Sequence, residues 1–389
     1  MQLDFHYYAT YCAAYIAGYS HEESLTIAYS DQFMDVCTRT LLSKLNAPLS
    51  AATTQSQLEL ADAMTDVAGL QDITRIWASF HFLPYDLNAD PGRKVSKKYL
   101  AKYRLICDAN GPLVKETIDL AKGKSLQAVG IAMHILADTW AHKYFAGTPS
   151  LVINNTMGYF YEIIKENGEV TERPVRFAPN PMNPDNPETS QYVNTLYQIS
   201  ETSIMSLGHG RAGHLPDYSF MRYKYLPAWG DYEEIVKDNP DDYFHAFTQM
   251  IYAMKYIRSE GGTFETGQYD TEAVAQWEDE IKAIFEKRQL DSCEDWKAFG
   301  EKLTGQTIED FDAEKYQDEY TSAAADEKNN TFLGKIFVGA LAQKSMITNR
   351  IYKSGNMLAG YSVDYKKKGF KGISDFFALV QAKIGEDKK

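Results

Sequence analysis

The sequence predicts a mainly α-helical protein, a multi-helix bundle with a small β-hairpin excursion and a helical C-terminal extension. Apolar residues recur at helical intervals along most of the chain, and strand-like material with a hairpin turn signal, ENGE, occurs only within 151–176. After residue 261 histidine disappears and Glu, Lys, Asp and Gln dominate. We therefore expect a helical domain over 1–261, which holds every histidine and which the motifs below predict to bind metal, and an acidic helical region over 262–389, packed on the first domain or appended to it.

The chain opens with a predicted helical hairpin. Residues 5–17 have helical spacing and end at Gly18, which suits a left-handed C-cap. Ser20 can cap a second helix over 20–42, with Glu23 at the capping-box position. These two helices should pack side by side.

The clearest helix signal in the chain lies in its middle. Ser125 can cap a helix whose apolar residues keep helical spacing until Gly147. Helical spacing is also present over 97–121, and a Pro- and Asn-rich loop is expected at 177–190. Further helices are predicted at 190–207, 240–260, 270–289, 293–303, 309–320, 331–352 and from Ser374 onward, with an irregular aromatic segment before the helix at 240.

Charge and composition exclude several classes of function. The net charge of −13 opposes an extended nucleic-acid or anionic-membrane surface, since both require a broad basic face. The four cysteines have no CxxC or regular spacing, which predicts reduced thiols rather than disulfides or a thiolate metal site. No 18-residue apolar run and no secretory signal are visible, so we expect no transmembrane segment and a cytoplasmic protein.

The strongest chemical motif lies on the central predicted helix. His134, Asp138 and His142 are spaced four residues apart and fall within roughly 80 degrees of one helix face. Imidazole and carboxylate are common zinc ligands. A surface stripe or a hydrogen-bonded core trio would show the same spacing, but the apolar neighbours indicate burial, and a buried carboxylate needs a cation.

A glycine-rich loop, LGHGRAGHLPD, forms a second cluster. It carries His209 and His214, with Arg211 between them and Asp217 close by. Glycine allows the turns that would bring both imidazoles to one point. The alternative is an ordinary loop whose histidines face water.

Three other residues are candidate metal ligands only when they are considered together. His6 and Asp35 lie on the two helices of the predicted opening hairpin, and His81 lies in the apolar segment SFHFLP. Alone, His81 is better explained as a hydrogen-bonded core histidine. His21 and His245 are expected to be surface or packing residues. The chain lacks GxSxG, Walker, GxGxxG and HExxH motifs, so serine-nucleophile, nucleotide and zincin functions have no local signature.

The N-terminal phrase DFHYYATYCAAYIAGYSHEESLTIAYSDQFMD and the SFHFLP, HILADTWAH and GHGRAGHLPD segments resemble an uncharacterised bacterial family of unknown function. Their order is also similar to the helical superfamily of zinc-dependent phospholipase C and single-strand-specific nucleases, whose members hold a trinuclear zinc site. That resemblance implies one to three zinc ions, or another divalent metal. The implied metal ligands are His6, Asp35, His81, His134, Asp138, His142 and either His209 or His214.

The expected function is therefore a metal-dependent hydrolase of phosphate esters with a small-molecule or lipid-like substrate. Asp35 or Asp138 would act as the base that orients the attacking water, and Arg211, with Lys143, would neutralise the phosphate. One alternative is a non-catalytic helical protein with a structural metal site or an interaction role. Another is a redox or oxygen-activating enzyme that uses iron or manganese. The sequence sets no oligomeric state.

Overall fold

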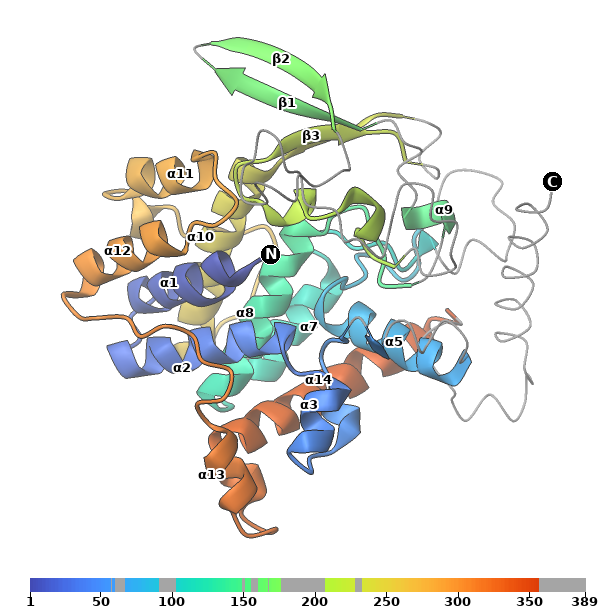
Figure 1. Cartoon of the computed structure of the whole chain (residues 1–389), viewed down its shortest axis with the longest axis vertical. Helices are drawn as coiled ribbons and strands as arrows, with labels where there is room; N and C mark the ends of the chain where they lie inside the picture. Colours follow the sequence, from blue (N-terminus) through green and yellow to red (C-terminus); the bar gives the residue numbers. More distant parts are fainter. Residues whose placement is uncertain are drawn as a thin grey trace.

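The structure, a computed structural model, is mainly helical with a small four-stranded antiparallel sheet, which confirms the predicted fold class at that level (Figure 1). Among the described residues, no helix has the length and apolar character that crossing a membrane requires. The structure describes residues 1–56, 58–59, 67–90, 103–148, 151–154, 160–166, 168–175, 207–227 and 233–356.

The predicted opening hairpin is confirmed for most of its length. A π-helical turn, η1 (Asp4–Ala9), continues into α1 (Thr10–Ile16), and Gly18 follows with φ +93°. Helix α2 (His21–Gln32) begins with the predicted capping box between Ser20 and Glu23.

The second predicted helix does not run unbroken to residue 42. A 3-10 turn, η2 (Phe33–Asp35), follows α2, and the chain then starts a new helix, α3 (Arg39–Lys44). The break has a local cause. Thr38 is extended, and its side chain accepts a hydrogen bond from the backbone N–H of Leu41, which makes it the N-cap of α3. A short 3-10 turn, η3 (Leu49–Ala51), follows.

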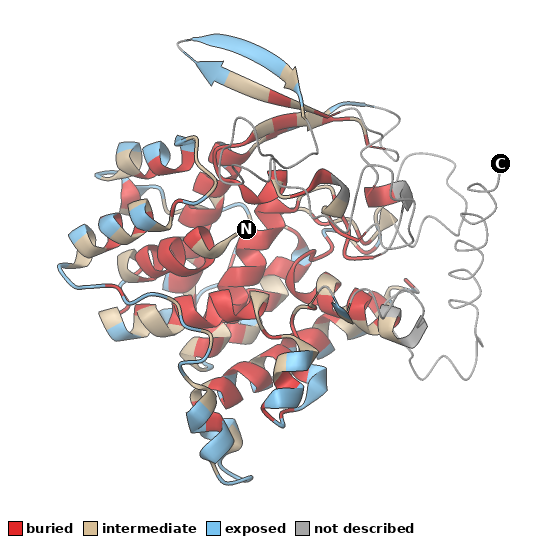
Figure 2. Cartoon of the chain, viewed as in Figure 1, coloured by how far each residue is buried: buried red, intermediate tan, exposed pale blue. Residues whose placement is uncertain are grey.

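Helix α8 (Leu126–Ala141) runs through the middle of the bundle, and Figure 2 shows it almost entirely buried. It packs against α2, α5 (Val67–Phe80), α7 (Pro112–Ala121), α10 (Asn239–Arg258) and α14 (Phe332–Lys353). Of the helical stretch predicted over 97–121, only Tyr103 and the α7 segment are helical within the described residues. Residues 104–111 form turns and isolated β-bridges, because Asn110 has a positive φ and Pro112 begins a new helix. Helix α8 also ends before the predicted Gly147, at Ala141.

The sheet has the strand order β2-β1-β3-β4, with every neighbouring pair antiparallel. The predicted hairpin is present as β1 (Phe160–Glu166) and β2 (Glu169–Pro174), and it projects from the bundle in Figure 1. Strands β3 (Arg222–Tyr225) and β4 (Ile235–Asp238) replace the irregular segment that the sequence suggested. Alternating Tyr223 and Tyr225 are buried there, in a second small core with Phe82, Phe145 and Phe160.

The C-terminal helices pack on the bundle and share its main core. Helix α12 (Cys293–Thr304) contacts η1 and α1, and α14 contacts α8 and α5. The helix predicted over 309–320 is shorter than expected and is present as α13 (Gln317–Ser322). Three other predictions lie outside the described residues: the loop at 177–190, the helix at 190–207 and the helix from Ser374. The domain boundary at 261 stays a prediction. The remaining elements are α9 (Leu151–Asn154), η4 (Gly210–Ala212), η5 (Leu215–Asp217), η6 (Glu272–Val274), α11 (Glu278–Glu286) and η7 (Lys328–Asn330). All four cysteines are free thiols, as predicted.

Candidate metal centre

Asp138 lies at the centre of a buried group of histidines. Its side chain is 1% exposed, and its two oxygens are approached from different elements. His6 Nε2 lies 3.2 Å from Oδ1, while His81 Nδ1 and His134 Nε2 lie 3.0 Å and 3.4 Å from Oδ2. His142 Nδ1 lies 3.6 Å from Oδ2. The helical face predicted from sequence therefore turns inward and meets histidines from the N-terminal half of the chain.

The local backbone explains why these side chains reach one point. His6 lies in the π-helical turn η1, a geometry that shifts the helix face by part of a turn and is frequent at functional sites. His81 follows directly after α5. His142 is the C-cap of α8, and its backbone N–H still donates to the Asp138 carbonyl, so its side chain stays near the His134 face.

Three of the histidines are anchored on their outer side by backbone carbonyls. His81 Nε2 donates to Thr53 O at 2.9 Å, and His142 Nδ1 donates to His81 O at 2.7 Å. His209 Nδ1 donates to Gly213 O at 2.7 Å. A carbonyl oxygen only accepts, so the anchored nitrogen must carry the proton, and in the neutral imidazole the other nitrogen then presents a lone pair.

These lone pairs face carboxylate oxygens. His81 Nδ1 lies 3.0 Å from Asp138 Oδ2, while His142 Nε2 and His209 Nε2 lie 3.2 Å and 3.5 Å from Asp217 Oδ1. Two acceptors this close repel each other unless a cation lies between them. Imidazoles that donate outward to carbonyls and point a lone pair inward have the usual arrangement of metal-binding histidines. The side chains therefore fit a divalent ion.

Asp31, which the sequence analysis missed, supports two further imidazoles. Its Oδ1 lies 2.7 Å from His6 Nδ1 and 3.1 Å from His134 Nδ1, and Thr10 Oγ1 donates to its Oδ2 at 2.8 Å. The His6 and His134 rings stack at 4.0 Å. Both His6 nitrogens are buried close to carboxylates, yet neither makes a well-directed hydrogen bond to a described residue, a pattern that fits an imidazole able to bind an ion. Asp31 precedes Asp35 by one helical turn, and that spacing was the available sequence signal.

The two central carboxylates create a strongly cation-attracting region. Burial opposes their charge, yet His142, the Met1 amino group and His134 hold the pKa of Asp138 well below its usual range. The pKa of Asp217 is lowered in the same way, by His209 and the Met1 amino group. The Met1 nitrogen lies 2.9 Å from Asp138 Oδ1 and 3.3 Å from Asp217 Oδ1, and despite burial these carboxylates raise its pKa to about 11.

The imidazoles respond differently to this environment. Burial opposes protonation of His134, but Asp138 and Asp35 outweigh it and raise the pKa to about 10. Burial lowers the pKa of His81, and it lowers that of His209 to about 4. Neutral His81 and His209 keep the lone pairs that metal binding requires.

Asp35 lies on the more open side of the centre. Its side chain is 29% exposed, and its Oδ1 lies 3.8 Å from both His81 Nδ1 and His134 Nε2. Within the part of the chain that the structure describes, it forms with these residues one of three groups whose ligand atoms lie within 4.8 Å of one another. The three groups are His6 with Asp31 and His134, Asp35 with His81 and His134, and His142 with His209 and Asp217.

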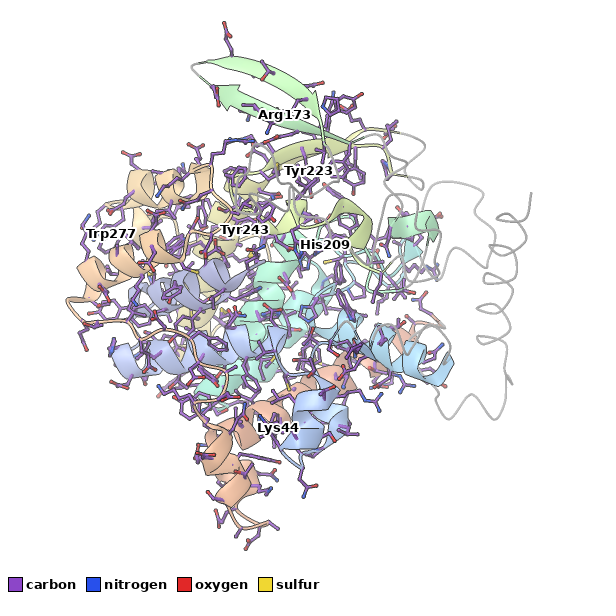
Figure 3. The ribbon with its side chains drawn as sticks, viewed as in Figure 1. Lys44, Arg173, His209, Tyr223, Tyr243 and Trp277 are labelled. Carbon is purple, nitrogen blue, oxygen red and sulfur yellow. The ribbon has the colours of Figure 1, made fainter. Side chains whose placement is uncertain are left out.

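The glycine-rich loop contributes differently from the prediction. His209, labelled in Figure 3, joins His142 and Asp217, whereas His214 is 38% exposed and belongs to none of the three groups. His214 Nδ1 lies 3.0 Å from Asp217 Oδ2. The loop therefore supplies one histidine, His209, and one carboxylate, Asp217, to the candidate centre, and His214 contacts that carboxylate. The Arg211 side chain lies outside the described residues.

Other predicted residues lie apart from the metal centre. Lys143, expected near a substrate phosphate, is paired with Asp242 at 2.6 Å and lies over the Trp140 ring. His245 stacks on the Trp140 ring, and His21 bonds to a tyrosine hydroxyl. These two histidines are packing residues, as expected.

The fold and the site define a class: a mainly helical protein with buried His and Asp groups able to hold metal ions. The chain belongs to a family of unknown function, DUF6765, whose model matches residues 1–354. No curated protein and no solved structure matches the chain.

Proposed function

We propose that the protein is a metal-dependent hydrolase of phosphate esters, with zinc as the metal and a bundle of the zinc-dependent phospholipase C type. One observation carries the proposal: outward-anchored imidazoles direct their free nitrogens at Asp138 and Asp217 in a buried centre. The order of the motifs, from His6 to the glycine-rich loop, supports the same class.

The ligands would come from the histidines of the three groups together with Asp35, Asp138 and Asp217. A bound divalent ion would supply a Lewis acid for the phosphoryl oxygen and would activate a water for attack. Asp138 lies 3.0–3.4 Å from His6 in η1, His81 after α5 and His134 in α8, so it would hold an ion from the buried side. Asp35 lies within 4.0 Å of the same three histidines on the open side. The nitrogen-rich, thiolate-free donor set suits zinc, and it also accommodates iron or manganese.

Residues on the open side would handle the substrate. Asp35 is part-exposed while its neighbours are buried, so its carboxylate can hold an attacking water and accept its proton. Arg211 would bind the substrate phosphate, a role that rests on its place in the loop between His209 and His214. A small-molecule or lipid-like phosphate ester is the corresponding substrate class.

The rival function is a closed, structural metal site. A structural ion is surrounded by protein ligands, whereas a catalytic ion keeps one position for water. The part-exposed Asp35 favours the open arrangement. Solvent access at this side chain is the observation that supports catalysis over a structural role.

Elemental analysis tests the proposal directly. Protein purified without added metal should hold stoichiometric zinc, and the His134→Ala and Asp138→Ala variants should lose it. His245→Ala, outside the centre, is the matched control and should keep it. Hydrolysis of bis(p-nitrophenyl) phosphate and p-nitrophenyl phosphorylcholine should follow metal content across these proteins. A wild-type protein that binds no zinc at neutral pH would overturn the proposal, and a zinc-loaded protein inactive on both esters would favour the structural role.

A further inference from the structure

A groove on the outside of the bundle lies between α7, α8 and α14. Its volume is about 420 Å³, within the range of roughly 300–1,000 Å³ that small-molecule sites occupy. It is lined by α8 residues 128, 131 and 132, which precede His134 on the same helix. None of the candidate metal ligands lines it.

The floor of the groove is apolar because small residues from all three helices meet there. Ala121 comes from α7, Ala128 and Ala132 from α8, and Gly339 and Ala342 from α14. At Gly339 a Cβ atom would come within 2.7 Å of Ile131 Cδ1, so the missing side chain helps to form the hollow. Val338, at the same surface, is 47% exposed. An apolar chain would cover these groups.

The charge at the groove has one sign. Lys124 and Lys335 line it and are exposed, and no Asp or Glu is among the lining residues. In the part of the chain that the structure describes, neither lysine has a carboxylate partner. Two such lysines at one apolar hollow stand out in a chain of net charge −13. An anionic head group would complement them.

The polar groups deeper in the groove already have partners. Gln343 Nε2 donates to Thr117 Oγ1 at 3.0 Å and to Ser79 O at 3.3 Å. A ligand therefore need not form hydrogen bonds with these side chains. The groove combines an apolar floor with a cationic rim, and no acidic group lines it.

From this combination we propose that the groove is a second binding site, for a single-chain carboxylate amphiphile such as a fatty acid. The acyl chain lies along the small residues of α8 and α14, and the carboxylate lies between Lys124 and Lys335. The site is independent of the proposed hydrolase function, since it uses none of the metal-centre residues.

Isothermal titration calorimetry with dodecanoate, below its micelle concentration, tests the site on the full chain. We compare dodecyltrimethylammonium, which has the same chain and a cationic head, and dodecyl maltoside, which is neutral. Lys124→Glu combined with Lys335→Glu reverses the rim charge, and Ala342→Trp fills the groove from an exposed position. Lys44→Glu with Lys302→Glu is the charge-matched control, because these lysines are 66% and 65% exposed and do not line the groove.

Wild-type protein and the control should bind dodecanoate at one site. The rim-reversed and groove-filled variants should each bind at least about tenfold more weakly, and the cationic surfactant should prefer the rim-reversed variant. The proposal is overturned if dodecanoate does not bind, if both groove variants bind like wild type, or if affinity is the same for all three head groups. It is also overturned if Ala342→Trp changes only the sedimentation behaviour, which would make the groove a contact between copies.

Discussion

At each histidine of the centre, the hydrogen bond on the outer side of the imidazole determines which ring nitrogen is available to bind a metal ion. Each carbonyl that accepts from a histidine fixes one tautomer and leaves the second nitrogen for the interior. Asp31 acts in the same way on His134, through Nδ1, and approaches His6 Nδ1 as well. We therefore interpret Asp31 as a positioning residue and Asp138 as a ligand.

Replacing Asp31 by Asn tests this division of roles. The amide keeps the size but loses the charge that supports two imidazoles, so we expect zinc affinity to fall roughly 10- to 100-fold while stoichiometry is kept. Competition with a chromophoric chelator measures the affinity. Asp241→Asn, at a 69% exposed carboxylate, should have no effect. If Asp31→Asn abolished zinc binding as completely as Asp138→Ala, Asp31 would itself be a ligand.

A buried lysine away from the centre gives a prediction for pH. Lys344 on α14 is 7% exposed, and burial lowers its pKa from 10.5 to about 8, although its amine donates to Ala52 O at 3.1 Å. Below pH 8 the amine is charged in both the folded and unfolded states, so the full cost of burying the charge is present. Between pH 8 and 10.5 only the folded state releases the proton, and stability rises with pH.

The Lys344→Met variant should therefore be more stable than wild type at neutral pH. The lowered pKa of Lys344 corresponds to a gain of about 3 kcal/mol at most in the free energy of unfolding when the charge is removed. Loss of the hydrogen bond to Ala52 offsets about 1 kcal/mol of this gain. Urea unfolding at pH 7 and pH 10 measures the difference, which should shrink at the higher pH. Lys353→Met, at an exposed position of the same helix, is the control. A difference that stayed constant between the two pH values would contradict the assignment to buried charge.

Among the elements, the close approach of α2 and α8 brings Asp31 to His134. Gly130 makes that approach possible, because a Cβ there would lie 2.4 Å from Ile27 O and 2.9 Å from the Asp31 backbone nitrogen. These two atoms belong to the α2 backbone, which cannot move aside as a flexible side chain would. The spacing of these two helices thus sets the geometry of one side of the metal centre.

Gly130→Ala should force α2 and α8 apart. We expect a loss of about 1–3 kcal/mol in the free energy of unfolding, together with weaker zinc binding, since overpacking a dense core has a cost of that size. Chemical denaturation and chelator competition measure the two effects. Gly261→Ala, where an added Cβ meets nothing within 4 Å, should leave both unchanged. If the Gly130→Ala protein were less stable but bound zinc with unchanged affinity, the spacing of α2 and α8 would not determine the geometry of the site.

At the scale of the whole molecule, metal should stabilise the fold. The candidate ligands come from η1, η2, the residue after α5, α8 and the glycine-rich loop, so an ion that binds only the folded chain would link these parts together. Removing zinc with a chelator should lower the melting temperature, by an amount equivalent to about 3 kcal/mol when free zinc is 100 times the dissociation constant. Differential scanning calorimetry measures this. His245→Ala should respond like wild type, whereas a chelator effect that persisted in Asp138→Ala would place the stabilising ion elsewhere.

The helical class and the core of the candidate site were predictable, because helix periodicity and the His134 to His142 spacing are local signals. Residues whose role depends on packing were not. Asp31 appeared as one polar residue of the second predicted helix, and only the α2 to α8 contact reveals its partners. The loop offered two histidines, and its 3-10 turns direct His209 inward and leave His214 part-exposed. Strands β3 and β4 were missed because their four-residue length carries little pattern.

The separation of the ligands along the chain sets an order of assembly. His6 and Asp138 meet across 132 positions, and Asp217 joins them from still farther along the sequence. No single short segment of the polypeptide carries all of the candidate ligands, in contrast to a zinc finger, where the metal organises a nearby loop. At the proposed metal centre, an ion would bind only after these distant segments have met, so occupancy of the centre would report that the long-range topology is complete.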